Sequence, residues 1–363
     1  MKGKAVVAMS GGVDSSVTAA LLVEAGYDVT GIMLKLWKGD EQNNNSGCCN
    51  LGAAEDARRV ADVLGIPFYV FNFADRFEQT VIADFDATYA AGRTPNPCIR
   101  CNQWIKFDAL LERARDLGAD VLATGHYARV RERDGRYRLL RGIDTAKDQS
   151  YVLWMLTQSE LAHCRFPVGD MTKPETRAIA ADLGLRTASK PDSQEICFVR
   201  EGDLGAYLSD RVAAADRPGE IVDTSGHVVG EHAGVARYTI GQRKGLGISL
   251  GTPVFVTAID AASDRIVVGD RSNLLVDRLR LDEVSFVDDA PGPDDDVLVQ
   301  YRAHGEVAPA RVMAGSEGLE IAFSTPVEAV APGQSAVLYR ASEPDELLGG
   351  GIVASTAPVP ASA

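Results

Sequence analysis

The first 125 residues alternate between two patterns of apolar positions. Residues 4–9 form a short apolar, β-branched run, and a polar loop separates them from apolar residues at helical spacing over 15–25. Further strands are predicted at 28–34, 68–71 and 121–123, and further helices at 53–64, 77–91 and 102–117. Strands that alternate with helices of this length predict a parallel, Rossmann-like sheet, with ligands at the carboxyl ends of its strands.

The rest of the chain has the pattern of β structure. Residues 127–133 and 136–141 flank Asp134-Gly135, a dipeptide that suits a type I′ turn, and they predict a hairpin with six arginines that projects from the α/β body. After about residue 204, short strand-like runs are separated by turn residues. This pattern predicts a small β domain followed by a barrel or a sandwich, with the acidic stretch 288–296 as a solvated connection.

Composition and charge change this picture in one respect. A length of 363 residues with 45% hydrophobic and 24% charged residues is typical of a folded protein of two or three domains. The net charge of −14 would repel nucleic acid if it were evenly spread, but residues 1–200 carry −1 and residues 201–363 carry −13. Because residues 93–147 carry +5, a phosphate-binding face in the first half stays open as an option.

The chain has no run that approaches the ~20 apolar residues of a membrane helix, and its N-terminus lacks a signal-peptide pattern. We therefore expect a cytoplasmic protein without a membrane partner. Six cysteines in a reducing compartment indicate reactivity or metal binding rather than structural disulfides. Cys164 is assigned to packing, and Cys48 and Cys49 to a polar loop without chemistry.

The segment Ser10–Ser16 (SGGVDSS) lies between the first strand and the first helix. Its glycines let backbone N–H groups approach an anion, its serines add hydroxyl donors, and the helix N-terminus adds the positive end of its dipole. It lacks the Gly-Lys-Ser/Thr of phosphate loops that transfer a terminal phosphoryl group. The segment therefore predicts a phosphate cradle, and a glycine-rich turn that caps a helix is the alternative.

Two further segments carry cysteine. Cys98 and Cys101 lie in GRTPNPCIRCN, and Cys101 is expected at the start of the next helix, where the dipole favours the thiolate. Half of a structural zinc site is the alternative, although no second pair of matching spacing follows. Cys197 lies in DSQEICF, where burial between Ile196 and Phe198 is the alternative to a reactive thiol.

These motifs together carry a resemblance. SGGVDSS resembles the signature of the PP-loop ATP-pyrophosphatases, which cleave ATP to AMP and pyrophosphate while they adenylate a substrate. RTPNPCIRCN, ATGHY, KDQSY, DSQEICF and GQRKGLG follow in this order, and the set is similar to that of the bacterial tRNA-specific 2-thiouridylases over about residues 4–354. The resemblance implies an α/β fold with four segments. These are a PP-loop catalytic domain (1–204, with the hairpin at about 126–141), a small β-rich domain (205–272), a C-terminal β-barrel (273–356) and a flexible tail (357–363).

The resemblance also implies the chemistry: ATP-dependent 2-thiolation of the wobble uridine U34 of tRNA, with Mg²⁺ to screen the phosphates. Cys197 would carry a persulfide from a donor protein, and Cys101 would be the nucleophile that forms a transient disulfide with Cys197. Asp14 would be a metal ligand or a carboxylate that orients the loop. The partners would be tRNA and the donor protein, and not DNA.

The site residues implied by the resemblance fall into three groups. The ATP contacts are Ala8, Met9, Ser10, Gly11, Gly12, Val13, Asp14, Ser15, Leu34 and Gly125. The residues that face the target base are Asn96, Pro97 and Cys98, and the further RNA contacts are His126, Lys147, Asp148, Gln149, Gln300, Tyr301 and Gln334. Many relatives have Asp at the position of Cys98, and some have a cation at the position of Gln300.

Three other hypotheses stay open at this point. A PP-loop synthetase that adenylates a small metabolite would need no paired thiols. A thiolase of the same product would bind a [4Fe–4S] cluster through Cys98, Cys101 and Cys197. A non-catalytic RNA-binding protein would use ATP or zinc only structurally.

Overall fold

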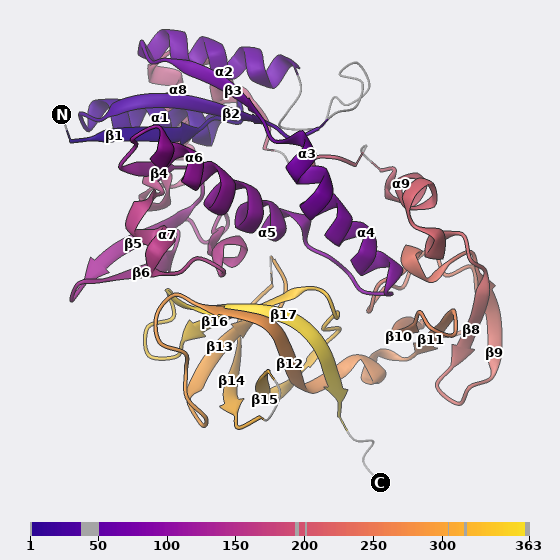
Figure 1. The fold of residues 1–363 in the computed structure, drawn as a ribbon. Helices are drawn as coiled ribbons and strands as arrows, with labels where there is room; N and C mark the ends of the chain where they lie inside the picture. Colours follow the sequence, from indigo (N-terminus) through magenta and orange to yellow (C-terminus); the bar gives the residue numbers. More distant parts are fainter. Residues whose placement is uncertain are drawn as a thin grey trace.

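The computed structural model describes residues 2–37, 51–192, 196–199, 202–303, 305–315 and 318–359. Cys48 and Cys49, and the last four residues of the expected tail, lie outside these ranges. The described chain forms a parallel sheet with helices, a small β sheet and a β-barrel, in this order along the sequence (Figure 1). None of the helices in the described ranges is long and apolar enough to cross a membrane.

The first sheet is parallel throughout, with strand order β3-β2-β1-β4-β7. Its strands are β1 (Lys4–Ala8), β2 (Asp28–Lys35), β3 (Phe68–Asn72), β4 (Val121–Ala123) and β7 (Cys164–Arg165). The chain leaves β1 on one side towards β2 and later returns on the other side as β4. The carboxyl ends of β1 and β4 therefore form the topological switch point where ligands bind in such sheets.

Both faces of the sheet are covered by helices. Alternate residues of β1 point to opposite faces, so that Val7 packs under α1 (Val13–Glu24), α2 (Leu51–Leu64) and α8 (Lys173–Asp182), whereas Val6 packs under the other helices. These other helices are two continuous rods. One contains α3 (Ala74–Phe77), a π-type stretch (Glu78–Ile82) and α4 (Ala83–Ala90); the other contains α5 (Pro97–Cys101), a second π-type stretch (Asn102–Leu110) and α6 (Leu111–Asp116). The Rossmann-like expectation is confirmed.

Short helices complete the first half. They are Ser150–Leu153, α7 (Gln158–His163), Pro167–Asp170 and Arg186–Ser189. After them come α9 (Leu204–Arg211), Ala213–Ala215 and Val235–Arg237. The central sheet has strand order β10-β11-β8-β9, from β8 (Gly219–Asp223), β9 (Val228–His232), β10 (Phe255–Asp260) and β11 (Arg265–Gly269). The sheet contains two antiparallel hairpins, β8–β9 and β10–β11, which join through the parallel pair β8–β11.

The C-terminal strands form a closed barrel, which settles the choice between a barrel and a sandwich. The helical turn Arg271–Leu274 leads into β12 (Leu275–Phe286), and the strands β13 (Asp296–Gln300), β14 (Ala308–Met313), β15 (Leu319–Glu328), β16 (Ser335–Arg340) and β17 (Glu346–Pro358) follow. Pairing of β12 with both β15 and β17 closes six strands. Because Ala357 and Pro358 still pair with β12, strand β17 runs into the segment predicted as a flexible tail.

The arginine hairpin has the expected turn but not the expected surroundings. Asp134 and Gly135 adopt φ angles of 54° and 74° between β5 (Ala128–Arg133) and β6 (Arg136–Arg141). The hairpin does not project from the α/β body, because β6 pairs with β17 and adds two strands to the barrel sheet. The pairing of Leu139 and Leu140 with Leu347 and Glu346 covers part of the β6 edge, and periodicity alone cannot foresee such an interdomain contact.

Candidate active site

The SGGVDSS loop lies at the switch point, between β1 and α1. Gly11 has φ of +72°, and a Cβ atom there would lie 2.3 Å from the carbonyl oxygen of Ala53 in α2. Gly125 follows β4, and a Cβ atom there would lie 2.7 Å from the backbone nitrogen of Ser15. Glycine at these two positions lets α2 approach the loop and lets the end of β4 approach the first turn of α1. The first N–H groups of α1 have no partner within the helix. The residues present fit the phosphates of a nucleotide.

Serine hydroxyls hold the loop in shape. The backbone N–H of Ser10 donates to the hydroxyl of Ser15 (3.2 Å), which in turn donates to the carbonyl of Gly12 (3.1 Å). Ser16 also donates to Gly12 (2.8 Å), and Thr187 donates to Ser16 (3.3 Å). These contacts fix Gly12 as the extended residue before the helix, which begins at Val13 rather than at Ser15 as predicted.

The other expected nucleotide residues surround this loop. Ala8 ends β1, Met9 is buried and its N–H donates to Ile32 of β2 (2.8 Å), and Leu34 is buried near the carboxyl end of β2. The structure therefore brings together all the residues predicted to contact ATP, because parallel strands present their carboxyl ends at one edge.

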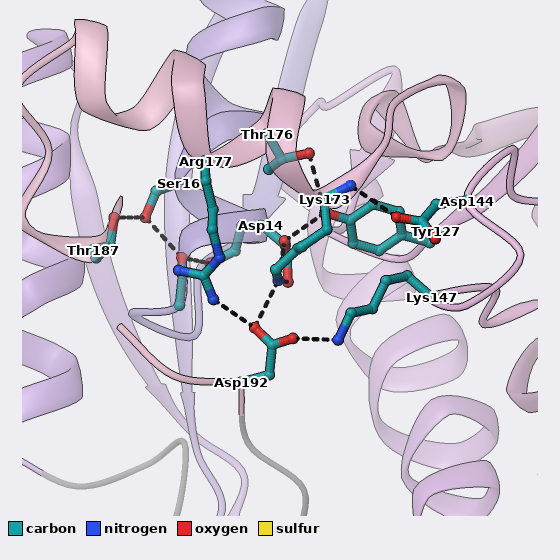
Figure 2. A network of polar contacts seen from close by, with 12 residues as sticks. Asp14, Ser16, Tyr127, Asp144, Lys147, Lys173, Thr176, Arg177, Thr187 and Asp192 are labelled. Atoms are coloured by element: carbon teal, nitrogen blue, oxygen red, sulfur yellow. Dashed lines mark hydrogen bonds and ion pairs between the residues drawn. The ribbon is translucent and has the colours of Figure 1, made fainter. Parts of the chain in front are cut away.

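A network of ion pairs begins at Asp14 (Figure 2). Both oxygens of its carboxylate accept hydrogen bonds from Lys173 Nζ (2.8 and 2.9 Å), and one also accepts from the hydroxyl of Tyr127 (2.9 Å). Lys173 is buried, and its ammonium group also lies 2.8 Å from Asp192. Of the two roles considered for Asp14, these contacts favour the carboxylate that orients the loop.

Asp192 connects the nucleotide loop with the segment that carries Cys197. Three cations converge on its carboxylate: Lys147 at 2.7 Å, Lys173 at 2.8 Å and Arg177 at 3.2 Å. Burial raises the pKa of Asp192, but the hydrogen bonds and charges of Lys147 and Lys173 outweigh it and hold that pKa below its usual value. The network also contains Asp144, whose carboxylate accepts from the backbone N–H of Lys173 (2.9 Å), so its three cations face three carboxylates.

Lys173 and Tyr127 were missed by the sequence reasoning. Lys173 is the first residue of α8, which Thr172 and Glu175 cap as a capping box. A cation at a helix N-terminus opposes the helix dipole, so an unpaired lysine there is disfavoured. In the sequence, a lysine that directly follows a capping threonine therefore indicates that its ammonium group pairs with a carboxylate elsewhere in the fold.

The segment with Cys98 and Cys101 is helical earlier than expected. The helix begins at Pro97 and not at Asn102, because the side chain of Asn96 accepts a hydrogen bond from the N–H of Ile99 (3.4 Å) as its cap. Cys98, in the first turn, is exposed, whereas Cys101 lies one turn later and is buried. The thiol nearest the helix N-terminus is therefore that of Cys98, which corrects the predicted placement of Cys101.

Cys197 shares a packing surface with this helix. The ring of its neighbour Phe198 contacts Phe77 and Phe85 of the first rod, at centroid distances of 5.6 and 5.1 Å. Cys101 belongs to the same apolar cluster, and Cys197 is half-buried against it. Both thiol segments thus pack on the rod 74–90. Within the described ranges, no three His, Cys, Asp or Glu residues form a group that could hold a metal ion, so the three thiols as placed do not fit an iron–sulfur cluster.

The residues expected to contact RNA near the sheet are held by protein partners. His126 is buried, its Nδ1 lies 2.6 Å from the hydroxyl of Thr124, and burial, followed by the charge of Lys106, holds its pKa well below 6.5. The carboxylate of Asp148 accepts from Arg141 (2.8 Å) and Ser150 (2.9 Å). Gln149 is exposed, and its Oε1 accepts from the N–H of Tyr127 (3.0 Å).

The barrel residues of this group lie in different surroundings. Gln300 is buried: its Oε1 accepts from Arg141 (3.1 Å), and its Nε2 donates to the carbonyls of Arg302 and Ala303. Tyr301 is half-buried against the ring of Phe323. Gln334 donates to the carbonyls of Thr94 (2.9 Å) and Pro95 (3.0 Å), so it reaches the thiol segment.

The six hairpin arginines pair with carboxylates, which changes how the local charge of +5 is understood. Arg129 pairs with Asp345, Arg131 with Asp170, Arg133 with Glu343, Arg136 and Arg138 with Asp288, and Arg141 with Asp148. Asp288, Glu343 and Asp345 come from the acidic second half. Asp288 was predicted in a solvated loop but is largely buried, because the hairpin covers it. The hairpin is thus a neutralised interdomain contact rather than an open basic face.

The Rossmann-like sheet with SGGVDSS at its switch point defines the class of the first domain as a PP-loop nucleotide-binding domain. Family models match three consecutive segments: a tRNA methyl transferase HUP domain (residues 3–201), a tRNA methyl transferase PRC-barrel domain (206–270) and an aminomethyltransferase beta-barrel domain (276–353). The chain is 50% identical over 372 residues to the tRNA-specific 2-thiouridylase MnmA of Roseiflexus sp. (strain RS-1), covering 97% of this chain and 99% of the relative.

The chain is also 48% identical to the tRNA-specific 2-thiouridylase MnmA of Heliobacterium modesticaldum, and the alignment covers 97% of this chain and 93% of the relative. The chain belongs to the tRNA-specific 2-thiouridylase family. A solved 4-thiouridine synthetase in complex with RNA and ATP has 18% identity and a TM-score of 0.36 over 59% of this chain and 51% of that chain, a likeness too low to bear on function.

Proposed function

We propose that this protein is an ATP-dependent tRNA sulfurtransferase that converts the wobble uridine U34 to 2-thiouridine in the cytoplasm. The observation that carries the proposal is the convergence of three segments. Lys173 pairs both with Asp14 of the phosphate cradle and with Asp192, which precedes Cys197 in the sequence. The Cys197 segment and the Pro97–Cys101 helix both pack against the rod 74–90.

The first proposed step is adenylation. The uridine O2 attacks the α-phosphorus of ATP, a P–O bond forms to the base, and pyrophosphate leaves. The backbone N–H groups of the loop, with Lys173 nearby, stabilise the charge of the departing pyrophosphate, and Mg²⁺ bound with the triphosphate would screen the phosphates. This step turns the oxygen at C2 into part of a good leaving group, AMP.

The second proposed step is sulfur transfer. A donor protein leaves a persulfide on Cys197; the thiolate of Cys101 attacks the Cys197 Sγ, a disulfide forms, and hydrosulfide leaves. Hydrosulfide then attacks C2 of the base, the bond to the adenylated oxygen breaks, and AMP departs with it. A dithiol reductant returns both cysteines to thiols with two electrons. The scheme requires the two Cα atoms to come within ~7 Å during turnover.

The RNA contacts form part of the proposal. Asn96, Pro97 and Cys98 face the base, which is unpaired in the anticodon loop and so enters a pocket at low cost. Lys147, Gln149 and Tyr301 are exposed or half-buried and contact the RNA directly. His126, Asp148, Gln300 and Gln334 support these contacts from positions where they already bond to the protein.

The experiment supplies unmodified tRNA, ATP, Mg²⁺ and a persulfide donor, and measures 2-thiouridine by nucleoside mass spectrometry. Cys101→Ala and Cys197→Ala should each abolish the product, while Cys164→Ala, at a buried cysteine on β7, should retain it. Burial raises the pKa of the Cys164 thiol, so this cysteine stays protonated and unreactive. Product formation by Cys197→Ala, or its absence from the wild type with an active donor, would overturn the proposal.

Pyrophosphate exchange separates this function from a small-metabolite synthetase. The wild type should exchange pyrophosphate with ATP only when tRNA is present, because the uridine oxygen is the adenylated atom. Exchange that proceeds without tRNA would favour the synthetase instead.

A further inference from the structure

The barrel binds the segment that carries Cys101 at both of its ends. At its start, Arg93 donates to the carbonyl of Ala354 (2.8 Å), and the N–H of Thr94 donates to the carbonyl of Pro332 (2.9 Å). Gln334 bonds to the next two carbonyls. The approach is close, since a Cβ atom at Gly333 would lie 2.9 Å from the backbone of Thr94.

At the other end, a single arginine joins the thiol helix to the barrel. Arg100, directly before Cys101, is buried, and its two terminal nitrogens donate to the two oxygens of Glu283 (2.7 and 2.9 Å). Arg100 also donates to Asp84 of the first rod (3.3 Å) and lies over the ring of Trp104 at 4.7 Å. A planar guanidinium held by a two-point contact cannot rotate without breaking a hydrogen bond, so it fixes the helix turn that carries it.

Glu283 reaches this arginine because strand β12 is irregular there. The pairing of β12 with β17 shifts register between Asp282 and Ser285, and Glu283 itself has φ of +50°. Such a conformation is disfavoured for a residue with a side chain, and bulges of this kind re-aim side chains next to functional sites. The Glu283 side chain is 55% exposed, so its own packing does not account for this geometry.

The protonation behaviour of the two carboxylates agrees with this geometry. The hydrogen bond from Arg100 lowers the pKa of Glu283, whereas burial raises the pKa of Asp84. Of the two carboxylates that contact Arg100, Glu283 therefore stays ionised to a lower pH than Asp84 does.

We propose that Glu283 is a positioning residue for sulfur transfer: through Arg100 it fixes the helix turn of Cys101, so that the barrel completes the catalytic site of the first domain. The inference rests on the proposed function, because it takes Cys101 as the nucleophile. It assigns the barrel a part in the chemistry in addition to any contact with RNA. Since a reacting group displaced by ~1 Å can cost ~100-fold in rate, the effect should be large for a half-exposed side chain.

The test compares Glu283→Gln with Glu328→Gln, which removes a charge from another arginine–glutamate contact of the barrel, where Nε of Arg271 donates to both oxygens of Glu328 (2.9 Å each). Glu283→Gln should lower kcat for 2-thiouridine formation about tenfold or more, with the KM for tRNA and the tRNA-dependent pyrophosphate exchange within about twofold of wild type. Glu328→Gln should change none of these. The melting temperature of each variant excludes misfolding as the cause.

A double-variant cycle adds a readout that a general structural role would not move. Combining Arg100→Gln with Glu283→Gln should cost no more than the worse single variant, because the two side chains act as one unit. Additive losses, or a Glu283→Gln variant with wild-type kcat, would overturn the inference. The proposed function fails separately: if Cys101→Ala still forms 2-thiouridine, Cys101 is not the nucleophile, whatever Glu283 does.

Discussion

At the scale of single residues, burial near the switch point sets the protonation state of His126. His126 is 8% exposed, between Phe107 and Phe166, and its imidazole can hydrogen bond to Thr124 while neutral. Burial disfavours the imidazolium, and the charge of Lys106 adds to this effect, so its pKa lies well below 6.5. His126 is therefore neutral at physiological pH and can act there only as a neutral hydrogen-bonding group.

This burial has a consequence for stability. In the unfolded chain His126 takes up a proton near pH 6.5, whereas the folded chain does not, so the free energy of unfolding should fall as pH drops below 6.5. The slope from this one group reaches at most ~1.4 kcal/mol per pH unit. Urea unfolding between pH 5 and 8 should show that His126→Asn reduces the slope, whereas His227→Asn, at an exposed histidine, retains it. An unchanged slope in His126→Asn would contradict the burial argument.

At the scale of elements, the nucleotide site depends on how closely β4 approaches α1. No side chain fits at Gly125, because a Cβ atom would lie 2.7 to 2.9 Å from atoms of Ser15 and Asp14. Gly125→Ala should push the β4 end away from the cradle and lower tRNA-dependent pyrophosphate exchange about tenfold or more, since the reacting phosphates lose their alignment.

Filter binding of labelled tRNA, run beside the exchange assay, separates this loss from misfolding, because the substitution leaves the barrel and its proposed RNA contacts unchanged. Gly292→Ala is the matched control: its Cβ atom would have Asp295 as nearest neighbour at 3.6 Å, an ordinary contact. Normal exchange by Gly125→Ala would show that the cradle tolerates displacement of β4.

At the scale of the whole molecule, ion pairs between the basic hairpin of the first half and the acidic barrel of the second half connect the two halves. The acidic barrel supplies Asp288, Glu343 and Asp345 to the arginine hairpin, while β6 pairs with β17. Asp288 lies between Arg136 and Arg138 and is largely buried. The negative charge of the second half is thus partly a complement to the hairpin of the first half and need not oppose binding of tRNA.

Asp288→Asn should lower the free energy of unfolding by ~1–3 kcal/mol, because Arg136 loses its carboxylate partner and Arg138 keeps only Glu346, at 3.5 Å. Differential scanning calorimetry should show a lower midpoint, with the hairpin and barrel uncoupling first. Asp289→Asn makes the same charge change at the exposed neighbour and should leave the midpoint unaltered. If both variants behave alike, net charge and not the ion pair accounts for the effect.

The local structure of this protein can be read from its amino-acid sequence: the strand–loop–helix units, the SGGVDSS cradle and the Asp134-Gly135 turn follow from periodicity and turn chemistry that act over a few residues. Which distant groups meet depends on the packing of the whole chain. Lys173 with Asp14 and Asp192, Arg100 with Glu283, and the hairpin with the barrel join segments up to 216 positions apart. Such pairs cannot be recognised from sequence periodicity, because a buried charge requires a partner that is close in space and that can come from any part of the chain.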